Sequence, residues 1–534
     1  MKKTAAQVKN LSLAGAIREA YTRGQEDEAL EPIVKADPAG KPKGRFGTGD
    51  YVIFYDIRGE REIELTQSLT EDDFGHFSRR RHLHLHFVTM ISYDPMLRAK
   101  TAFPAEEKIK NTLTEVISRQ GLRLAKISES EKAVHVGYFL NGKSDEVFPG
   151  EERFVIPSPQ DVASYVQKPE MSAVLVAQEV KRKLRDLSYS VIIANLANVD
   201  VVGHSEDKPA ILKAVETVDS ALGEIVEECR RQGVVLIVTS DHGTVEEWLY
   251  PDGTVNTGHT RNPVPLILAD FSGEGPEAWV LEETGELADV APTVLDVLST
   301  SEPEEMTGKS LILRRPRQSG TRLRVALLIL DGWGFKEEVQ GNLILEARTP
   351  HFDGLWSCFP HSRLRASGEA VGMPSHTVGN SEAGHLHLGA GRRVFLDRVR
   401  IDRSIEDGSF FNNPAFLWAM EGAKRDKKAL HLMGIVSHYS SHGTIRHLFA
   451  LLRLAKNVGL TEVYIHAFIG RRGERPESGA IYVEKVEETA KELGVGETVT
   501  VLGRYWALDR EENWDRVEKA YRALVHGEGT KISG

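Results

Sequence analysis

The sequence predicts an α/β protein of two domains, and three observations support this prediction. Short apolar runs of the kind that form buried strands alternate with longer stretches in which apolar residues recur at helical spacing. The alternation occurs in the middle of the chain and again near its end. The 534 residues, 41% of them hydrophobic, are enough for two or three domains with their own cores.

The middle of the chain gives the first series of strands and helices. The run SVIIANL at 190–196 is followed by a helical stretch at 210–232, and GVVLIVTS at 233–240 follows that helix. RVALLIL at 324–330 continues the pattern. Strands separated by helices of this length are typical of βαβ units, so we expect a mostly parallel, doubly wound sheet.

A second α/β region follows in the last third of the chain. Its strand-like runs are KKALHLMGIVS at 427–437, TEVYIHAFI at 461–469 and ETVTVLGRYW at 497–506. Between the two regions, RRPRQSGTR at 314–322 is polar and contains proline, glycine and four arginines. This composition favours a linker.

Composition and charge exclude several classes of protein. The net charge of −11 argues against nucleic acid as a partner, and no apolar run is long enough to span a bilayer. The basic start of the chain is interrupted by Asn10 and Arg18, which favours an amphipathic helix over a signal peptide. Cys229 and Cys358 are too few for a disulfide framework. We therefore expect a monomeric cytoplasmic protein that binds a small molecule and no membrane.

Acidic residues and histidines follow three of the predicted strands. The carboxyl ends of parallel strands meet at one edge of a sheet, and ligands bind there. Carboxylate and imidazole groups together suit divalent transition metals such as Mn²⁺ or Zn²⁺, and this set is large enough for two ions. A helix cap or a turn is the alternative for each aspartate taken singly. The residues are Asp331, Asp241, His242, Asp200, His204 and, in a loop before the next apolar run, His259.

A serine in the segment VGNSEAGH is a candidate nucleophile. Ser381 lies between Gly379 and Gly384, which allow a tight turn and a close approach of the backbone to an anion. No catalytic base is evident next to it, but a metal ion beside a hydroxyl lowers its pKa and can replace a base. The alternative is an ordinary turn residue.

Basic residues near other strand ends and turns could bind an anion. Guanidinium groups bind carboxylate and phosphate through paired hydrogen bonds, so they suit a small substrate that carries both groups. A solvated surface position is the alternative for each of them. The candidates are Arg504, Arg510, Arg58, Arg61, Arg472 and Lys132.

Eight stretches of the sequence point to a known family: they are ALLILDGWGF, ASGEAVGMPSHTVGNSEAGHLHLGAGR, GRYWALDREENWDRVEKAYRALVHGEG, KPEMSA, NVDVVGHS, SDHG, GHTRNPVP and EMTGKSL. Together they resemble the cofactor-independent (2,3-bisphosphoglycerate-independent) phosphoglycerate mutases of the alkaline phosphatase superfamily. The resemblance implies a phosphatase-like metal-binding domain and a transferase-like domain that close on phosphoglycerate. The implied reaction interconverts 3-phosphoglycerate and 2-phosphoglycerate through a phosphoserine, without 2,3-bisphosphoglycerate. Two divalent metal ions are implied, with Mn²⁺ expected and Mg²⁺, Co²⁺ or Zn²⁺ as alternatives.

The resemblance also implies roles for individual residues. One metal ion would be held by Asp200, His204 and His259. The other would be held by Asp331, Asp241, His242 and Ser381, with Ser381 as the nucleophile that becomes phosphorylated. The positions that would contact the substrate are His442, Arg472, Arg504, Arg510, Arg58, Arg61 and Lys132.

The order of the stretches differs from that of the family and predicts a circular permutation. In the family the DGWGF strand and the serine turn come first and EMTGKSL comes last, whereas here EMTGKSL runs through the linker into ALLILDGWGF. We therefore expect a contiguous phosphatase-like domain at 107–395. The transferase-like domain would combine residues 1–106 with 396–534.

The substrate-side motifs also differ from the family. Its DGRD motif reads GRRG here, so Gly473 replaces the aspartate proposed to move the proton of the substrate hydroxyl, and His442, His438 or Glu474 would have to do so. The SDGGVHSH motif reads SHYSSHGT, and Glu60 lies between the two arginines of IRGER. Two alternatives follow. The protein could be a phosphohydrolase or act on another phosphomonoester, or it could bind phosphorylated acids without turnover.

Overall fold

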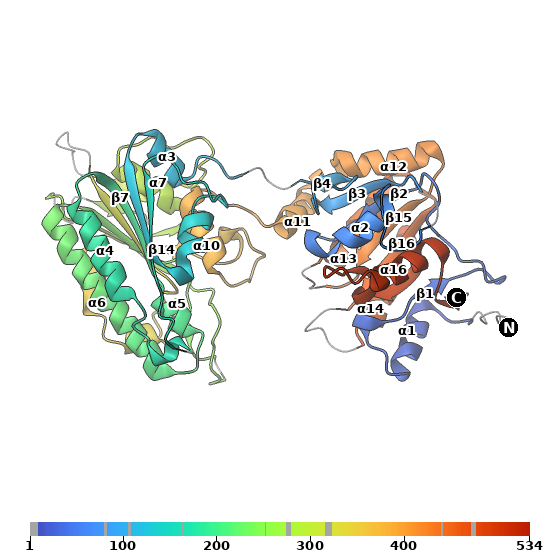
Figure 1. Ribbon diagram of the computed structural model, residues 1–534, viewed down its shortest axis with the longest axis horizontal. Coiled ribbons are helices and arrows are strands. Elements are labelled where there is room, and N and C mark those ends of the chain that lie inside the picture. Colours follow the sequence, from blue (N-terminus) through green and yellow to red (C-terminus); the bar gives the residue numbers. More distant parts are fainter. Residues whose placement is uncertain are drawn as a thin grey trace. The chain divides into compact units, whose positions relative to one another are not determined.

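The chain folds into two compact units, as seen in a computed structural model. The model describes residues 9–79, 83–104, 108–162, 164–250, 252–273, 279–315, 323–438, 440, 442–470 and 477–534. Unit 1 consists of Met1–Ala105 and Asp397–Gly534, and unit 2 of Glu106–Leu396. The blue and red segments of Figure 1 therefore lie together in unit 1, because this unit is formed from both ends of the chain.

Unit 2 is built on a sheet with the strand order β11-β14-β9-β8-β13-β7-β5-β6. Its central strands β8, β13, β7, β5 and β6 are parallel, and β9 is antiparallel to both of its neighbours. The strands are β5 (Arg123–Glu129), β6 (Glu151–Ile156), β7 (Tyr189–Leu196), β8 (Val235–Thr239), β9 (Val264–Asp270), β11 (Thr284–Glu286), β13 (Val325–Leu330) and β14 (His361–Arg365), with β10 (Val280–Leu281) and β12 (Ile312–Arg314) paired separately.

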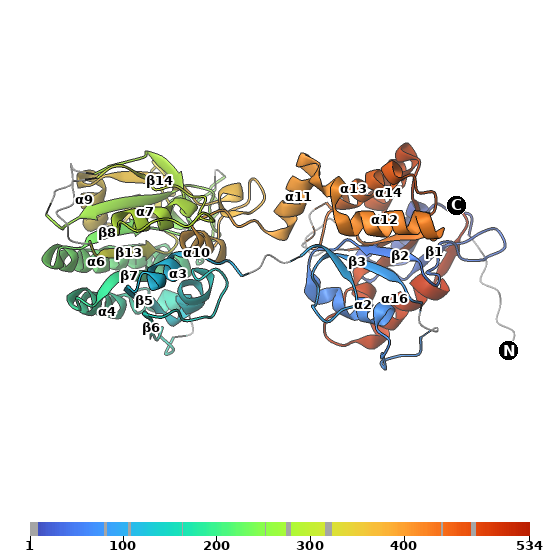
Figure 2. The ribbon, with the colours of Figure 1, turned by 90° about the horizontal axis from the view of Figure 1, so that it is seen from above.

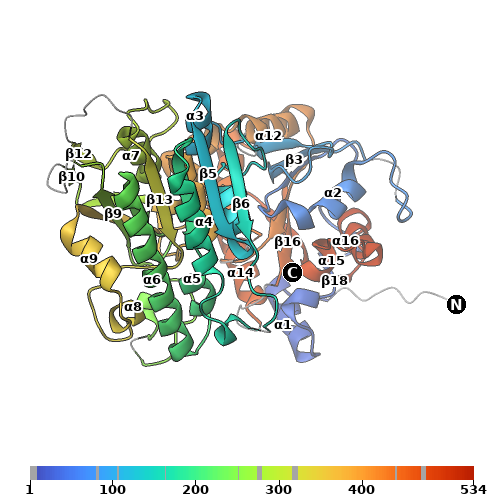
Figure 3. The ribbon, with the colours of Figure 1, turned by 60° about the vertical axis from the view of Figure 1, so that its left-hand side comes forward.

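Helices cover both faces of this sheet. Side chains of β13 alternate: Ala326 and Leu328 belong to one core cluster with α4 and α6, whereas Leu327 and Ile329 belong to another with α3 and α7. Figure 3 shows α4 and α6 over the same face of the sheet. A sheet buried on both faces requires continuous apolar strands, which is how this strand appears in the sequence. The helices are α3 (Leu113–Arg119), α4 (Ala173–Arg185), α5 (Asn198–Gly203), α6 (Lys208–Gln232), α7 (Val290–Val297), α8 (Leu343–Glu346), α9 (Pro350–Cys358) and α10 (Ser381–Ala390).

Unit 1 has a second sheet, with the strand order β18-β1-β17-β16-β15-β2-β3-β4. Strands from β17 to β4 in this order are parallel, and β15 from the end of the chain pairs with β2 from its beginning. The strands are β1 (Ile33–Lys35), β2 (Tyr51–Phe54), β3 (His86–Ile91), β4 (Lys100–Phe103), β15 (Leu430–Ile435), β16 (Val463–Ile469), β17 (Glu497–Gly503) and β18 (Thr530–Ile532).

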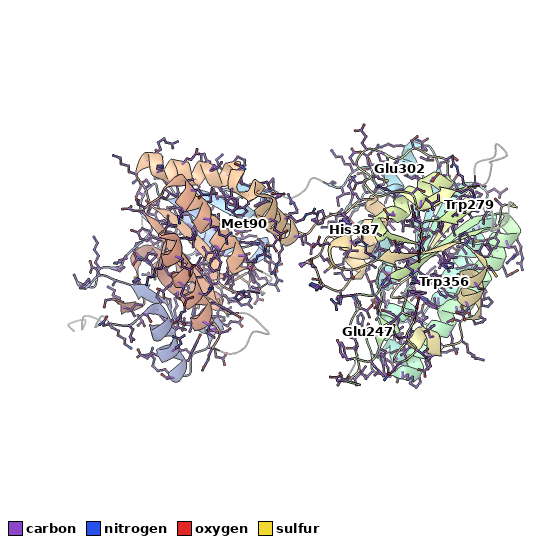
Figure 4. All side chains as sticks on the ribbon, turned by 180° about the vertical axis from the view of Figure 1, so that it is seen from behind. Met90, Glu247, Trp279, Glu302, Trp356 and His387 are labelled. Carbon is purple, nitrogen blue, oxygen red and sulfur yellow. The ribbon has the colours of Figure 1, made fainter. Side chains whose placement is uncertain are left out.

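Helices also lie on both faces of the sheet in unit 1. Figure 2 shows α12, α13 and α14 on one face and α2 and α16 on the other. Met90 of β3, labelled in Figure 4, is fully buried in the core between these layers. The helices are α1 (Leu13–Thr22), α2 (Ile63–Thr70), α11 (Asp397–Asp407), α12 (Pro414–Asp426), α13 (Ile445–Val458), α14 (Gly479–Leu493), α15 (Arg504–Ala507) and α16 (Trp514–His526).

The predicted α/β class with two domains is confirmed, and both large sheets are mostly parallel, as expected. Each large sheet also contains antiparallel pairing: β9 runs against both of its neighbours, and β1 runs against β17 but parallel to β18. In its described part, the connection from β8 to β9 contains the short 3₁₀ turn Val245–Glu247, and β9 returns antiparallel to β8. Of the predicted linker, residues 316–322 lie outside the described residues. Among the described residues, no helix is long and apolar enough to cross a membrane.

Candidate functional site

Polar side chains converge at the carboxyl ends of four adjacent parallel strands in unit 2. Strands β8, β13, β7 and β5 are neighbours in the sheet, and each is followed by a candidate residue. The chain order of the strands differs from this spatial order, so residues far apart in sequence come together here. The residues are Asp241 and His242 after β8, Asp331 after β13, Asp200 in α5 after β7, and Lys132 in the 3₁₀ turn after β5.

One group in this cluster has the geometry of a metal site. The Nε2 atoms of His204 and His259 lie 3.1 Å apart, and they lie 3.3 Å and 3.1 Å from Oδ1 of Asp200. The Nδ1 atom of each ring is 2.8 Å from a backbone carbonyl, of Thr257 for His204 and of Gly379 for His259. A carbonyl only accepts, so each Nδ1 carries the hydrogen and each Nε2 directs a lone pair toward the same point. This donor set fits a divalent cation, because second hydrogen bonds of this kind orient histidine ligands.

A second group surrounds Ser381. Its Oγ is 3.0 Å from Nε2 of His242 and 3.4 Å from Oδ1 of Asp331, and Asp241 is fully buried beside them. Two buried carboxylates, an imidazole and a hydroxyl also form a suitable donor set for a divalent ion. The seven residues that the sequence predicted as metal ligands therefore lie together at one edge of the sheet.

Lys132 lies within this cluster rather than with the arginines of unit 1. Its Nζ is 2.6 Å from Asp200 Oδ2, 2.7 Å from Asp331 Oδ1 and 2.7 Å from Ser381 Oγ, and the residue is only 4% exposed. Burial by itself would lower the pKa of Lys132, but the carboxylates of Asp331, Asp200 and Asp241 raise it above its ordinary value. Lys132 is therefore a cation held directly against the hydroxyl of Ser381.

The backbone of α10 places Ser381 at the first turn of a helix. Asn380 is the N-cap, and its side chain accepts a hydrogen bond from the Ala383 N–H at 2.8 Å. The N-terminus of a helix stabilises negative charge, as a phosphate on this serine would require. Gly384 allows the close packing, since a Cβ there would lie 2.5 Å from the carbonyl oxygen of Asp241. A Cβ at Gly379 would lie 2.2 Å from the carbonyl oxygen of Ala366.

Two residues that support this site were not predicted from the sequence. Asn195, inside β7, donates through Nδ2 to Oδ2 of Asp331 at 2.7 Å and lies 3.0 Å from Nε2 of His385. His385 therefore carries its hydrogen on Nδ1 and donates it to the Ser381 carbonyl at 2.9 Å, with Oδ2 of Asp241 3.2 Å away. Asn195 orients Asp331 through its hydrogen bond. His385 follows Ser381 by four residues on a helix, and this spacing could have identified it.

His387 on the same helix has a structural role. Its Nε2 accepts a hydrogen bond from the Val394 N–H at 3.0 Å, and its Nδ1 lies 2.7 Å from the Ala383 carbonyl. Burial lowers the pKa of His387 to about 4, so the ring stays neutral. Figure 4 labels both His387 and Glu247. Oε2 of Glu247 accepts a hydrogen bond at 2.9 Å from Nδ2 of Asn262, which lies in the loop that carries His259.

Unit 1 gathers basic residues at the carboxyl ends of its own parallel strands. Arg58 and Arg61 follow β2, His442 follows β15, and Arg504 and Arg510 follow β17. Glu60 joins two of them, with Oε1 2.8 Å from both Arg58 and Arg510. Burial, and then the charges of Arg510, Arg504 and Arg58, lower the pKa of Arg61.

Arg472, predicted to contact the substrate, lies outside the described residues, as do Gly473 and Glu474. His438 is described and packs edge-on against Tyr482, with ring centres 5.1 Å apart.

Comparisons with known proteins found two matching family models, the first of which covers parts of both units. A model described as the Metalloenzyme superfamily matches residues 10–302, and one described as the BPG-independent PGAM N-terminus matches residues 401–533. The 2,3-bisphosphoglycerate-independent phosphoglycerate mutase 2 of Methanosarcina acetivorans is 44% identical over 299 residues, which cover 56% of this chain and 56% of that protein. The 2,3-bisphosphoglycerate-independent phosphoglycerate mutase of Moorella thermoacetica is 44% identical over 300 residues, 56% of this chain and 57% of that protein.

A solved structure is also similar. Leishmania mexicana phosphoglycerate mutase, solved at low cobalt concentration, matches with 26% identity and a TM-score of 0.35, covering 52% of this chain and 53% of that one. The chain spans about half the length of the curated relatives that it matches.

Proposed function

We propose, from the premise that this chain belongs to the Metalloenzyme superfamily, that it interconverts 3-phosphoglycerate and 2-phosphoglycerate through a phosphoserine at Ser381. The observation that carries the proposal is the surroundings of the Ser381 hydroxyl. It lies at a helix N-terminus, 2.7 Å from the ammonium of Lys132 and 3.0 Å from Nε2 of His242. The names of the relatives support the choice of substrate.

Two divalent ions, which we propose to be Mn²⁺, would be held by the two groups described above. Asp200, His204 and His259 would hold one ion, and the second would lie among Asp331, Asp241, His242 and Ser381. Bound ions of this kind lower the pKa of a serine hydroxyl and neutralise the charge on a phosphoryl group.

The residues of the chain would carry the phosphoryl group in two transfers. Ser381 Oγ would attack the phosphorus in line as the bond from phosphorus to the glycerate oxygen breaks, and the proton lost by the serine would end on that oxygen. Lys132 and the N-terminus of α10 would stabilise the charge on the phosphoryl oxygens. Arg58, Arg61 and Arg504 bind the carboxylate of the glycerate while it turns. Its other hydroxyl then takes the phosphoryl group back from Ser381. We propose that Arg472 also binds the substrate. We propose that Arg510 belongs to the same set, because Glu60 links it to Arg58.

We also propose that the chain is a circular permutation of the family's order. In support, unit 2 is contiguous in sequence while unit 1 is formed from both ends of the chain. A permutation is physically tolerable where new ends fall in exposed segments.

The test is to add 3-phosphoglycerate and Mn²⁺ to the protein and to measure 2-phosphoglycerate and free phosphate together. We expect 2-phosphoglycerate without stoichiometric phosphate release, and phosphate on Ser381 by mass spectrometry. If free phosphate is the only product, the protein is a phosphohydrolase and not a mutase. If neither product forms and Ser381 stays unmodified, the protein only binds phosphorylated acids.

A further inference from the structure

Glu246 is a fully buried carboxylate between the loops of unit 2 that carry proposed metal ligands. It lies in the 3₁₀ turn Val245–Glu247 after β8 and is 0% exposed. Its Oε2 accepts a hydrogen bond from the Thr244 N–H at 2.8 Å. Its Oε1 accepts hydrogen bonds from Oγ1 of Thr260 and, at 3.0 Å, from Nδ2 of Asn262. Both oxygens are therefore used by neighbouring donors.

The hydrogen bond to Thr244 connects Glu246 to the loop after β8. Thr244 follows His242 by two residues, and its Oγ1 lies 3.3 Å from Nδ1 of the His242 ring. Nε2 of the same ring is the atom that lies 3.0 Å from Oγ of Ser381. By fixing the backbone at Thr244, Glu246 therefore helps to orient the ring of a proposed ligand.

The hydrogen bonds to Thr260 and Asn262 connect Glu246 to the loop that carries His259. Thr260 directly follows His259, and its N–H donates to the carbonyl of Gly243 at 3.0 Å. Backbone and carboxylate hydrogen bonds thus join this loop to the loop after β8. His259 is a proposed ligand of one ion, whereas the loop after β8 carries proposed ligands of the other. Glu246 therefore links the two proposed ion sites.

The carboxylate is also packed against the loop after β13. Gly334 lies three residues after Asp331, and a Cβ at this position would lie 2.1 Å from Cδ of Glu246. A Cβ at Gly243 would lie 2.4 Å from Oε1 of the same side chain. Glycine at both positions lets the backbone approach the carboxylate this closely. The loop that carries Asp331 therefore packs on the same group as the other two loops.

The turn that contains Glu246 packs against α5 as well. Gly203 lies in α5 between Asp200 and His204, and a Cβ there would lie 2.7 Å from Cγ1 of Val245. Val245 is itself 0% exposed. The remaining proposed ligands of the first ion are therefore next to the same turn.

We propose that Glu246 is a positioning residue that holds the ligands of both metal ions in place by joining the loops that carry them. The inference rests on the proposed function, because the ions and their ligands are part of it. Glu246 acts through Thr244, through Thr260 and through its packing against Gly334. Hydrogen-bonding partners behind metal ligands typically change metal affinity by about 10- to 100-fold when they are replaced.

The experiment measures Mn²⁺ binding to the metal-free protein, with free Mn²⁺ followed by electron paramagnetic resonance. Glutamine at position 246 has nearly the size of glutamate, but its amide nitrogen is a donor. Whichever way the amide turns, this nitrogen faces another donor, either the Thr244 N–H or the side chains of Thr260 and Asn262. We expect Glu246→Gln to bind Mn²⁺ roughly 10- to 100-fold more weakly than the wild type.

Glu247→Gln is the matched control. Glu247 is the next residue in the chain, but its side chain is 31% exposed and its Oε2 lies 3.3 Å from Nζ of Lys336. An ion pair at such a partly exposed position contributes little. Glu247→Gln should therefore bind Mn²⁺ as the wild type does.

Turnover separates a positioning role from a direct role in the reaction. The proposed ligands are all intact in Glu246→Gln, so saturating Mn²⁺ should restore its kcat, with an unchanged KM for 3-phosphoglycerate. Wild-type Mn²⁺ affinity in a variant that folds, as judged by circular dichroism, would overturn the proposal. A kcat that stays low at saturating Mn²⁺ would also overturn it.

Thr260→Val is the second variant, for the case in which Glu246→Gln does not fold. It removes the hydroxyl that donates to Glu246 and leaves the hydrogen bond from Thr244, so it should also weaken Mn²⁺ binding. Wild-type affinity in Thr260→Val would then overturn the proposal. A wild-type protein that binds no Mn²⁺ would overturn it together with the proposed metal sites. A wild-type protein that binds Mn²⁺ but forms no 2-phosphoglycerate would refute the mutase assignment alone, and the affinities of the variants would still decide the role of Glu246.

Discussion

Replacing Gly384 by alanine should disable Ser381 with little change in the chemistry of the site. A Cβ at this position would meet the carbonyl oxygen of Asp241 at 2.5 Å and its Cβ at 2.7 Å. Both atoms belong to the loop that also carries His242, and the carbonyl is backbone, which no rotamer change can move aside. The helix and the loop must therefore separate.

The size of the effect follows from these distances. Carbon atoms pack at about 3.5 Å, so α10 must move by roughly 0.8 Å from the Asp241 loop. Overpacking of this kind costs about 1–3 kcal/mol, and the better helix propensity of alanine offsets up to about 1 kcal/mol of it. A misplacement of about 1 Å lowers a rate by about 10²-fold. We therefore expect a small loss of stability and a large loss of kcat.

Gly354→Ala provides the matched control. This glycine lies within α9 of the same unit, and a Cβ there would meet nothing within 4 Å. Alanine at 354 should stabilise the protein by up to about 1 kcal/mol and leave turnover unchanged. Thermal unfolding and the rate of 2-phosphoglycerate formation measure both effects. Full turnover in Gly384→Ala would show that the contact between α10 and the Asp241 loop does not position Ser381.

Three further predictions test other parts of the proposed site. Ser381→Ala should abolish the phosphoserine detected by mass spectrometry and retain most metal binding measured by elemental analysis; turnover at the wild-type rate would exclude this serine as the nucleophile. Treatment with a chelator should abolish turnover, and added Mn²⁺ should restore it, whereas activity that survives exhaustive chelation would refute the metal requirement. Arg504→Lys removes the paired hydrogen bonds of a guanidinium group, and a hydrogen bond to a charged ligand is worth about 1.5–3 kcal/mol. KM should therefore rise about tenfold or more in steady-state assays. An unchanged KM would place Arg504 outside the substrate site.

The sequence predicts the elements of the fold because each strand has a simple pattern. The run at 324–330 is apolar throughout since both faces of β13 are buried, and the helix before 233–240 shows the 3.6-residue period. The direction of β9 was not predictable from such patterns. It depends on the path of the 240–263 segment, whose polar sequence does not show on which side of the sheet the chain returns.

The candidate site could be predicted in part, for a related reason. Aspartates after strands are visible in the sequence, and parallel strands bring them to one edge. Their neighbours are fixed by the strand order β8-β13-β7-β5, which the chain order does not reveal. Lys132 illustrates this limit, because only its position after β5 places it against Asp200 and Ser381.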